Sequence, residues 1–336
     1  MFHEDTILKQ DNEYLIKMED PEDCLIVTDK DGIYYRLFNR PVTGHQKNEL
    51  DCMQFHEPVL KIVDYHEHTK GTETFIVSQG KFLCNCMGRG FTMEAGDLLH
   101  IQPWMGHSFT PIEPESRLNI LFMDIDMRHS LTDPRLRMLE KFPGVFDDLE
   151  FQDMFRKAGG GVGKRTIPVQ DDFPKDQVQQ LRPADYGIRE HEFKGIEMRL
   201  KVAKYETEGV KEIWDLFMEA GFYCEWDCFV PEYRMFYVTR GVMRCWVRTS
   251  ATETIEFYPN SENLIIIPPY TPFGFEVLER VRMYDLDCSA RLQDLCEELG
   301  SHKLNNEGKM PSKEDLLKMA KEYGLNITNV GCRFIL

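Results

Sequence analysis

Two stretches of the chain, residues 33–127 and 195–288, alternate apolar and polar positions over short runs. Both are rich in β-branched and aromatic side chains, and glycine and proline interrupt them at close intervals. Successive side chains of a strand point to opposite faces, so this period is typical of strands that bury one face. The pattern predicts two regions of many short antiparallel strands.

Helical spacing is confined to a few segments beside these regions. Leucines recur at helical intervals in "SLTDPRLRMLEKFP" at 130–143 and "SARLQDLCEELG" at 289–300. In "SKEDLLKMAKEYG", Ser312 with Asp315 fits a capping box, and the segment predicts a packing helix that Gly324 can terminate. The stretch "VKEIWDLFMEAG" at 210–221, which precedes the core strands of the second copy, is also amphipathic and is interpreted as an insertion.

The two β-rich regions resemble each other when one is shifted by about 161 residues along the other. "TFIVSQGKFLCNC" then lies over "MFYVTRGVMRCWV", with Gly80 on Gly241, and "FMDIDM" lies over "MYDLDC". "PWMGHSF" matches "PYTPFGF" if one loop of the second copy is about five residues longer. The repeat predicts two β-barrels or sandwiches in tandem.

This organisation predicts four segments: an N-terminal barrel at 1–127, a helical and glycine-rich linker at 128–194, a C-terminal barrel at 195–288, and C-terminal helices at 289–336. The linker contains "AGGGVGKRT", but it lacks the first glycine and the hydroxyl residue of a phosphate-binding loop. It is interpreted as a flexible turn that crosses between the barrels.

The charge balance narrows the class of partner. Forty basic and fifty-seven acidic residues give a net charge of -17, which would repel a nucleic-acid backbone. The start of the chain lacks the features of a secretory signal, and no apolar run is long enough to span a membrane. We therefore expect a soluble, cytoplasmic protein whose ten cysteines stay reduced and pack as small apolar groups.

Four residues of the first β-rich region have the side chains and the spacing of a metal site. His66 and His68 lie two apart, so on a strand they project from one face and can grip one ion. Glu73 follows across a turn and can return a carboxylate from the next strand, and His107 starts a later strand after the turns at 96–97 and 103–106. Three imidazoles and one carboxylate suit Fe(II), Mn(II), Ni(II), Co(II) or Zn(II).

The pattern His66-x-His68-x4-Glu73-x6-Gly80, followed by "GDLLHIQPWMGH", resembles the paired motifs of the cupin superfamily. The resemblance covers both β-rich regions, so the chain is similar to a bicupin, an all-β protein with two tandem barrels and a few peripheral helices. It implies that His66, His68, Glu73 and His107 hold one divalent metal ion per chain, and that the protein forms a homodimer.

The second copy departs from the motif at each ligand position. The shift places Asp227, Phe229 and Arg234 at the positions of His66, His68 and Glu73, and Phe273 at that of His107. These side chains cannot build a divalent site, so the C-terminal barrel is expected to be metal-free. A guanidinium at Arg234 can hold an anion or pair with a local acid such as Asp227.

Further residues are candidates for the pocket around the metal, each with a structural alternative. Asp64 can reach the pocket or lie in the turn, and His100 lies on the strand between the motif halves. Aromatic residues in a small barrel are usually core, so the remaining candidates are expected to be core or mouth residues: Phe75, Phe82, Trp104 and Met105.

The four ligands leave two positions open on an octahedral ion, which indicates chemistry on a small oxygen-rich substrate that chelates the metal. An iron-dependent dioxygenase is the main hypothesis, by resemblance to ring-cleaving bicupins with one degenerate barrel, although gentisate-type members usually lack the glutamate. The alternative is a non-redox isomerase, lyase or decarboxylase in which Glu73 moves a proton. A second alternative is a protein that binds a ligand through its metal without turnover.

Overall fold

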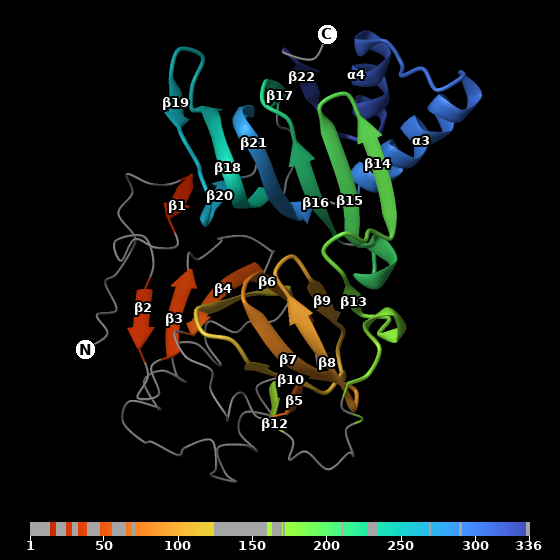
Figure 1. Cartoon of the computed structure of the whole chain (residues 1–336). Coiled ribbons are helices and arrows are strands. Elements are labelled where there is room, and N and C mark those ends of the chain that lie inside the picture. The colour runs from red at the N-terminus through yellow and green to blue at the C-terminus, as the bar shows by residue number, and fades with distance from the viewer. Residues whose placement is uncertain are drawn as a thin grey trace. The chain divides into compact units, whose positions relative to one another are not determined.

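The computed structural model describes residues 14–17, 25–28, 33–38, 48–55, 65–68, 71–123, 160–162, 170, 172–209, 211–227, 234–268, 270–288 and 291–333. The chain divides into two units (Figure 1). The first contains Met18–Asp185, and the second contains Tyr186–Leu336 together with Gln10–Lys17. Each unit is described by itself below.

The first unit contains two sheets of antiparallel strands. One has the order β13 (Leu181–Arg182), β9 (Leu98–Ile101), β6 (Thr72–Gln79), β11 (Ser116–Met123), β4 (Asn48–Phe55), β3 (Ile33–Phe38) and β2 (Leu25–Thr28). The other has the order β12 (Gly160–Val162), β5 (His66–His68), β10 (His107–Pro111), β7 (Lys81–Cys86) and β8 (Arg89–Glu94). A short 3-10 helix, η4 (Lys175–Gln177), precedes β13.

Apolar side chains from both sheets form one buried cluster in the first unit. The alternation predicted from sequence is seen on β7, where Phe82, Cys84 and Cys86 are buried and the residues between them are half-buried. Phe75 on β6 and Phe109 on β10 belong to the same cluster. Two sheets that bury their facing sides against each other are the architecture that the sequence predicts for a small barrel or sandwich.

The second unit is built on one sheet of ten strands, again antiparallel. The main order is β1 (Leu15–Lys17), β20 (Asn263–Ile267), β18 (Arg234–Arg248), β21 (Phe273–Cys288), β16 (Glu212–Met218), β15 (Ile196–Val202) and β14 (Arg189–Phe193). β19 (Thr254–Phe257) pairs with β18, and β17 (Phe222–Trp226) pairs with both β21 and β22 (Ile327–Cys332). A short 3-10 helix, η5 (Lys204–Glu206), follows β15.

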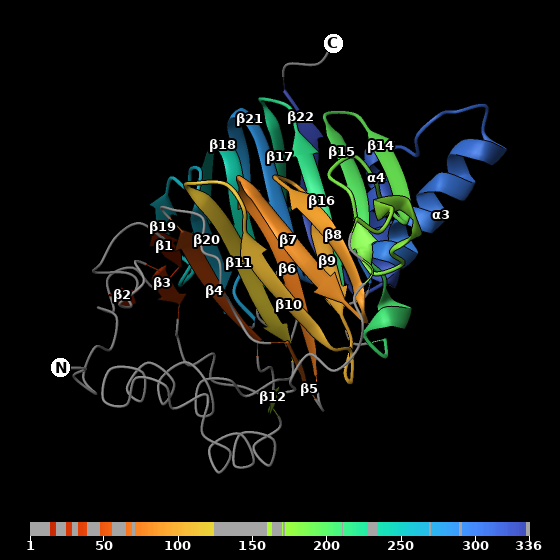
Figure 2. The ribbon, with the colours of Figure 1, turned by 60° about the horizontal axis from the view of Figure 1, so that its bottom comes forward.

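The two long strands β18 and β21 run side by side through the second unit (Figure 2). Their register shifts between Val238 and Met243, and such irregularities bend a strand. The first half of β18 pairs with β20 and the second half with β19. The bent sheet surrounds a buried cluster that includes Leu216, Phe236 and Phe275.

Two α-helices of the C-terminal region agree with the sequence prediction: α3 (Leu292–Asn305) and α4 (Lys313–Glu322). Ser312 caps α4 by accepting a hydrogen bond from the Asp315 backbone N–H at 3.2 Å, and Gly324 follows with φ 72°. Leu295 and Leu299 of α3 pack with Ala320 of α4. The predicted helix at 130–143 lies outside the described residues.

Two local predictions were wrong. "VKEIWDLFMEAG" is not an amphipathic insertion, because Glu212–Met218 forms the central strand β16 with all but one of its side chains buried. The glycine-rich segment is not a free turn between barrels either, because Gly160–Val162 forms β12 and pairs with β5. Cross-strand pairing overrides local composition in both segments.

The structure places the extra residues of the second copy in one hairpin. Cys84 pairs with Phe91, seven residues later, whereas Cys245 pairs with Phe257, twelve residues later. The longer loop predicted from sequence is therefore the connection between β18 and β19. Beyond it the equivalence holds in detail, because the Glu94 N–H donates to the Asp97 carboxylate as the Asn260 N–H donates to Asn263 Oδ1.

Two equivalences taken from the constant shift were wrong. His107 pairs with His66, and Phe273, at the place of His107, pairs with Trp226 rather than Asp227, which is exposed. The connection from β17 to β18 is thus one residue longer than its counterpart. "FMDIDM" and "MYDLDC" are also out of register, because the longer hairpin precedes them. Asp285 pairs with Phe236, and Ile120 pairs with the equivalent Phe75. Asp285 therefore stands at the place of Ile120.

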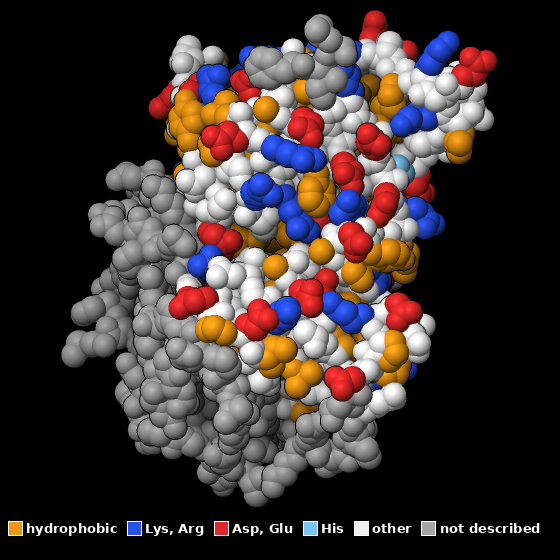
Figure 3. Space-filling view, in the orientation of Figure 1, with side chains coloured by type: hydrophobic (Ala, Val, Ile, Leu, Met, Phe, Trp, Pro, Cys, Tyr) orange, Lys and Arg blue, Asp and Glu red, His pale blue; other side chains and the backbone are white. Residues whose placement is uncertain are grey.

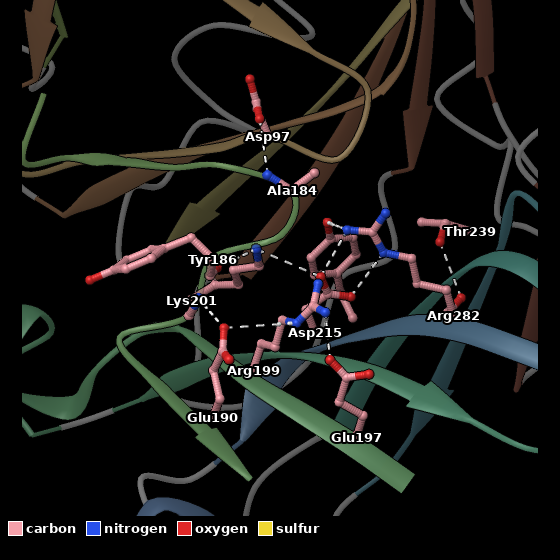
Figure 4. A network of polar contacts seen from close by, with 12 residues as sticks. Asp97, Ala184, Tyr186, Glu190, Glu197, Arg199, Lys201, Asp215, Thr239 and Arg282 are labelled. Carbon is pink, nitrogen blue, oxygen red and sulfur yellow. Dashed lines mark hydrogen bonds and ion pairs between the residues drawn. The ribbon is translucent and has the colours of Figure 1, made fainter. Parts of the chain in front are cut away.

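In each unit a buried carboxylate links separate segments of the chain (Figure 4). In the first unit, Asp97 accepts hydrogen bonds from the Ala184 N–H at 3.0 Å and from Lys175 Nζ at 2.6 Å, which holds the segment before residue 185 on β9. In the second unit, Asp215 accepts from Arg282 Nε at 3.0 Å and Nη2 at 2.8 Å.

The face in Figure 3 shows acidic and basic side chains interspersed over the described residues. Within the described part of the chain, no helix combines the length and the apolar character that a membrane span requires.

Candidate metal centre

Four ligand-type side chains meet in the first unit, and they are the four that the sequence spacing singled out. One ligand atom from each of His66, His68, Glu73 and His107 lies within 4.8 Å of the others. Glu73, His68 and His107 are buried, at 3 %, 2 % and 0 % exposure, and His66 is half-buried. No second cluster of this kind occurs among the residues that the structure describes.

Strand pairing explains why these residues meet. His66 on β5 lies directly opposite His107 on β10, and their ring centroids are 4.3 Å apart. His68 lies two residues along β5, so the period of the strand returns it to the same face. Glu73 comes from β6, which belongs to the other sheet of the unit. The cluster therefore joins the two sheets at one end of their shared core.

The carboxylate of Glu73 lies at the centre of the cluster. Its Oε2 is 2.9 Å from His68 Nε2 and 2.7 Å from His107 Nε2. Burial by itself would raise the pKa of Glu73, but the His107 and His68 imidazoles hold that pKa well below its ordinary value. Glu73 is therefore an ionised acceptor at neutral pH.

The backbone fixes the orientation of His107. Its Nδ1 lies 2.8 Å from the Met105 carbonyl oxygen, and a carbonyl can only accept, so Nδ1 carries the proton and donates. In the neutral ring Nε2 then presents a lone pair toward the Glu73 oxygen. Two lone pairs at 2.7 Å repel unless a cation, a proton or a metal ion, lies beside both. The donor set and its orientation thus fit a divalent cation.

Aromatic side chains enclose the buried side of the cluster. The Phe75 ring lies edge-on to His107 at 5.7 Å, and the Phe122 ring lies edge-on to His68 at 6.4 Å. Phe122 also pairs directly with Glu73 across β11 and β6, a contact that the sequence analysis did not single out. Low polarity around the carboxylate strengthens its attraction for a cation.

The loop before His107 contributes its backbone. Trp104 is exposed and has φ 67°, and its N–H donates to the His68 carbonyl at 2.7 Å. This bond and the Met105 carbonyl tie the loop to two candidate ligands. Backbone atoms leave no residue-specific signal, so the sequence could not identify these roles.

The glycine-rich strand β12 borders the same cluster. Gly160 pairs with His68 and Val162 pairs with His66. The segment that composition assigned to a linker therefore lies beside the candidate ligands of β5.

The remaining sequence candidates are distributed as follows. His100 is buried but lies on the opposite face of the sheet, with its Nδ1 2.9 Å from Thr74 Oγ1, so it does not join the cluster. Phe82 packs in the core against Phe55. Asp64 lies outside the described residues.

The second unit has different chemistry at the corresponding positions. Phe273 stacks on Trp226 with ring centroids 4.5 Å apart and an interplanar angle of 11°. Arg234, at the place of Glu73, is 3 % exposed and pairs with Asp285, not with Asp227, at an Nη2 to Oδ2 distance of 2.6 Å. An aromatic stack and an internal ion pair thus replace the ligand set.

Comparison with known proteins gives a structural likeness only. No protein-family model matches the sequence, and no curated protein matches it. Oxalate decarboxylase from Bacillus subtilis at pH 4.6 superposes with TM-score 0.51 at 15% identity, covering 90% of this chain and 84% of that chain. The formate complex of the Lactobacillus farciminis oxalate decarboxylase gives 0.51 at 15% identity, covering 90% and 95%.

A third structure, of the Bacillus subtilis oxalate decarboxylase and its Mn(II) centres, gives TM-score 0.51 at 13% identity over 94% of this chain and 88% of that chain. These proteins are bicupins. The likeness spans both units, so the chain has the bicupin fold of two tandem cupin barrels, as the sequence motif predicts.

Proposed function

We propose that the first barrel holds one divalent transition-metal ion through His66, His68, Glu73 and His107, and that this centre decarboxylates a small carboxylic acid. The observation that carries the proposal is the approach of His107 Nε2 to Glu73 Oε2 at 2.7 Å, while Nδ1 of the same ring is committed to the Met105 carbonyl. A buried carboxylate facing three imidazoles is a site for a cation.

The comparisons favour decarboxylation over the iron dioxygenase that the sequence motif first suggested. The three structures described above are oxalate decarboxylases, and one of them has Mn(II) centres. At 15% identity or below, these structures support the fold, and their decarboxylase activity only guides the choice of reaction proposed here. Nitrogen and carboxylate ligands also suit Mn(II), so we propose Mn(II) ahead of iron as the working ion.

The four side chains would leave coordination positions for a substrate carboxylate. When bound, the ion would act as a Lewis acid on that carboxylate. Met105 and its contact to His107 would hold one ligand in a fixed tautomer. Phe75 and Phe122 would keep water from the buried side of Glu73, so that the carboxylate stays fixed and ionised.

A metal-content measurement followed by turnover tests the proposal. The chain would be purified, loaded with Mn(II), and its metal measured by elemental analysis; we expect one ion per chain. Oxalate and related small mono- and dicarboxylic acids would then be tested for CO2 release and for O2 uptake. We expect CO2 release without stoichiometric O2 uptake.

Three outcomes distinguish the alternatives. Oxygen consumption in step with product favours the dioxygenase. Metal binding with no turnover of any acid favours a protein that binds its ligand through the metal. Failure to bind Mn(II), Fe(II), Co(II), Ni(II) and Zn(II) would remove the basis of the proposal.

A further inference from the structure

The interior of the second barrel contains a cavity of about 290 Å³. Strands of the sheet, among them β17, β18, β21 and β22, and the helices α3 and α4 line it. Most of the lining is apolar, including Cys224, Phe236, Phe275, Met283 and Cys296. This volume is roughly twice that of the engineered apolar cavity of about 150 Å³ that binds benzene.

The cavity also contains one ion pair. Arg234 and Asp285 both line it, they are 3 % and 1 % exposed, and Nη2 donates to Oδ2 at 2.6 Å. The Arg234 guanidinium carbon also lies over two aromatic rings, 5.0 Å from the centroid of Phe236 and 5.9 Å from the centroid of Trp226. A buried ion pair, neutral as a pair, thus lies in a chamber whose other buried lining residues are mainly apolar.

We propose that the second barrel is a binding site for an uncharged, mainly apolar small molecule that carries one hydroxyl or carbonyl group. The apolar body would occupy the chamber, and the polar group would hydrogen-bond to the Arg234–Asp285 pair. The cavity suits a ligand of about ten to fifteen non-hydrogen atoms, such as a two-ring aromatic compound.

The charge balance of the pair determines the class of ligand. A carboxylate that entered would lose its hydration and would face Asp285 as well as Arg234, whose positive charge Asp285 already compensates. Two other charged residues line the cavity, Lys194 and Lys313, and both are exposed to solvent, whereas Arg234 and Asp285 are buried. A neutral polar group incurs a much smaller desolvation penalty.

This site is separate from the metal centre. The cavity is lined only by residues of the second unit, between Phe193 and Gly331, and its polar group stands where the second barrel lacks the metal ligands. The proposal therefore does not depend on the activity of the first barrel. It assigns the second barrel a ligand of its own.

Calorimetric titration of the full chain with 2-naphthol and with 2-naphthoate tests the proposal. The two probes share a ring system and differ in whether the polar group is neutral or charged. We expect 2-naphthol to bind with one site per chain and 2-naphthoate to bind about tenfold or more weakly. Lack of saturable 2-naphthol binding, or tighter binding of 2-naphthoate, would overturn the proposal.

Two variants place the binding in the cavity. Cys224→Phe fills part of the chamber and should weaken 2-naphthol binding by about tenfold or more. Arg234→Met combined with Asp285→Leu replaces the ion pair by apolar side chains and should abolish the preference for 2-naphthol over naphthalene. Circular dichroism and thermal melting establish that each variant is folded.

His66→Ala serves as the control, because it alters the first barrel and should leave 2-naphthol binding unchanged. If 2-naphthol binds folded Cys224→Phe as tightly as the parent protein, or if His66→Ala abolishes binding, the ligand lies elsewhere and the proposal fails.

Discussion

Arg234 Nη2 lies 2.6 Å from Asp285 Oδ2 in the interior of the second barrel, at positions where the first barrel has Glu73 and Ile120. A cation has replaced the central carboxylate of the ligand set, and an acid has replaced an apolar core residue on the neighbouring strand. The two replacements balance each other, because the side chains carry opposite charges and both are buried. The second barrel thus pairs its buried charges with each other, whereas the first barrel has a set of candidate metal ligands at the corresponding positions.

The two members of this pair should be strongly coupled in stability. Arg234→Met leaves the Asp285 carboxylate buried without its guanidinium and should lower the free energy of unfolding by about 3–5 kcal/mol. The double variant Arg234→Met, Asp285→Leu should recover most of that loss, because neither charge remains. Urea unfolding of the parent, single and double variants measures the coupling, and additive losses would contradict it.

Metal retention should separate the two barrels. His107→Ala removes a candidate ligand whose orientation the Met105 carbonyl fixes, and we expect the Mn(II) content of the loaded protein to fall from one ion per chain to well below that. Phe273→Ala alters the equivalent position of the second barrel and should leave the content at one. Elemental analysis after gel filtration measures both. Two ions per chain in the parent protein would refute the asymmetry.

Two glycines at equivalent positions of the repeat, Gly80 between β6 and β7 and Gly241 within β18, should tolerate no side chain. Gly80 has φ +71°, and a Cβ there would lie 2.8 Å from the Ser116 Cα; Gly241 has φ +91°, and its Cβ would lie 2.2 Å from the Arg280 carbonyl oxygen. Gly80→Ala and Gly241→Ala should each cost about 2 kcal/mol or more of stability, from strained φ plus overpacking.

Gly209 provides the matched control for these substitutions. It has φ +80° but nothing lies within 4 Å of the added Cβ, so Gly209→Ala should cost only about 1 kcal/mol. Thermal or urea unfolding ranks the three variants. Equal losses would show that φ alone, and not the close approach of β11 or β21, sets the cost.

The buried cysteines should resist alkylation in the folded protein. Burial raises the pKa of the Cys86 thiol to about 12, and it raises the pKa of Cys84 and Cys245 further. The thiolate is the reactive form, so at pH 8 almost none is present, and burial also blocks the reagent. Mass spectrometry after iodoacetamide treatment should find these three unmodified until urea unfolds the chain.

Cys332 is the internal reference for that experiment, because it is half-buried. It should be alkylated faster than the three buried thiols in the native protein. Reaction of Cys86 at the same rate as Cys332 below pH 9 would contradict its burial and its raised pKa.

The proximity of the four candidate ligands could be predicted from the sequence because ligand chemistry and strand period are both local. His66 and His68 share a face by the period of the strand, and the turn at residue 71 returns the chain so that Glu73 can approach them. His107 required the further assumption that its strand lies beside β5, which the family resemblance supplied. The pairing of His66 with His107 satisfies that assumption.

The residues that sequence analysis missed depend on pairing between distant segments. Nothing in "AGGGVGKRT" indicates that Gly160 would pair with His68. The strand β16 shows the same limit, because its apolar positions fit a helix and a strand equally well until its neighbours bury both faces. A constant repeat shift also failed once loops of different length intervened, which moved the partner of Phe273 from Asp227 to Trp226.

By itself, the sequence determined the all-β class, the tandem repeat, the C-terminal helices and the identity of the four metal-site candidates, because period, capping and residue chemistry act over a few neighbours. The tertiary structure decided the register, and through it the partner of Arg234. A side chain on the neighbouring strand can be 51 residues away in the chain, as Asp285 is from Arg234. Only the folded sheet brings such residues together, so only the structure shows that the second barrel contains a cavity lined by a buried ion pair.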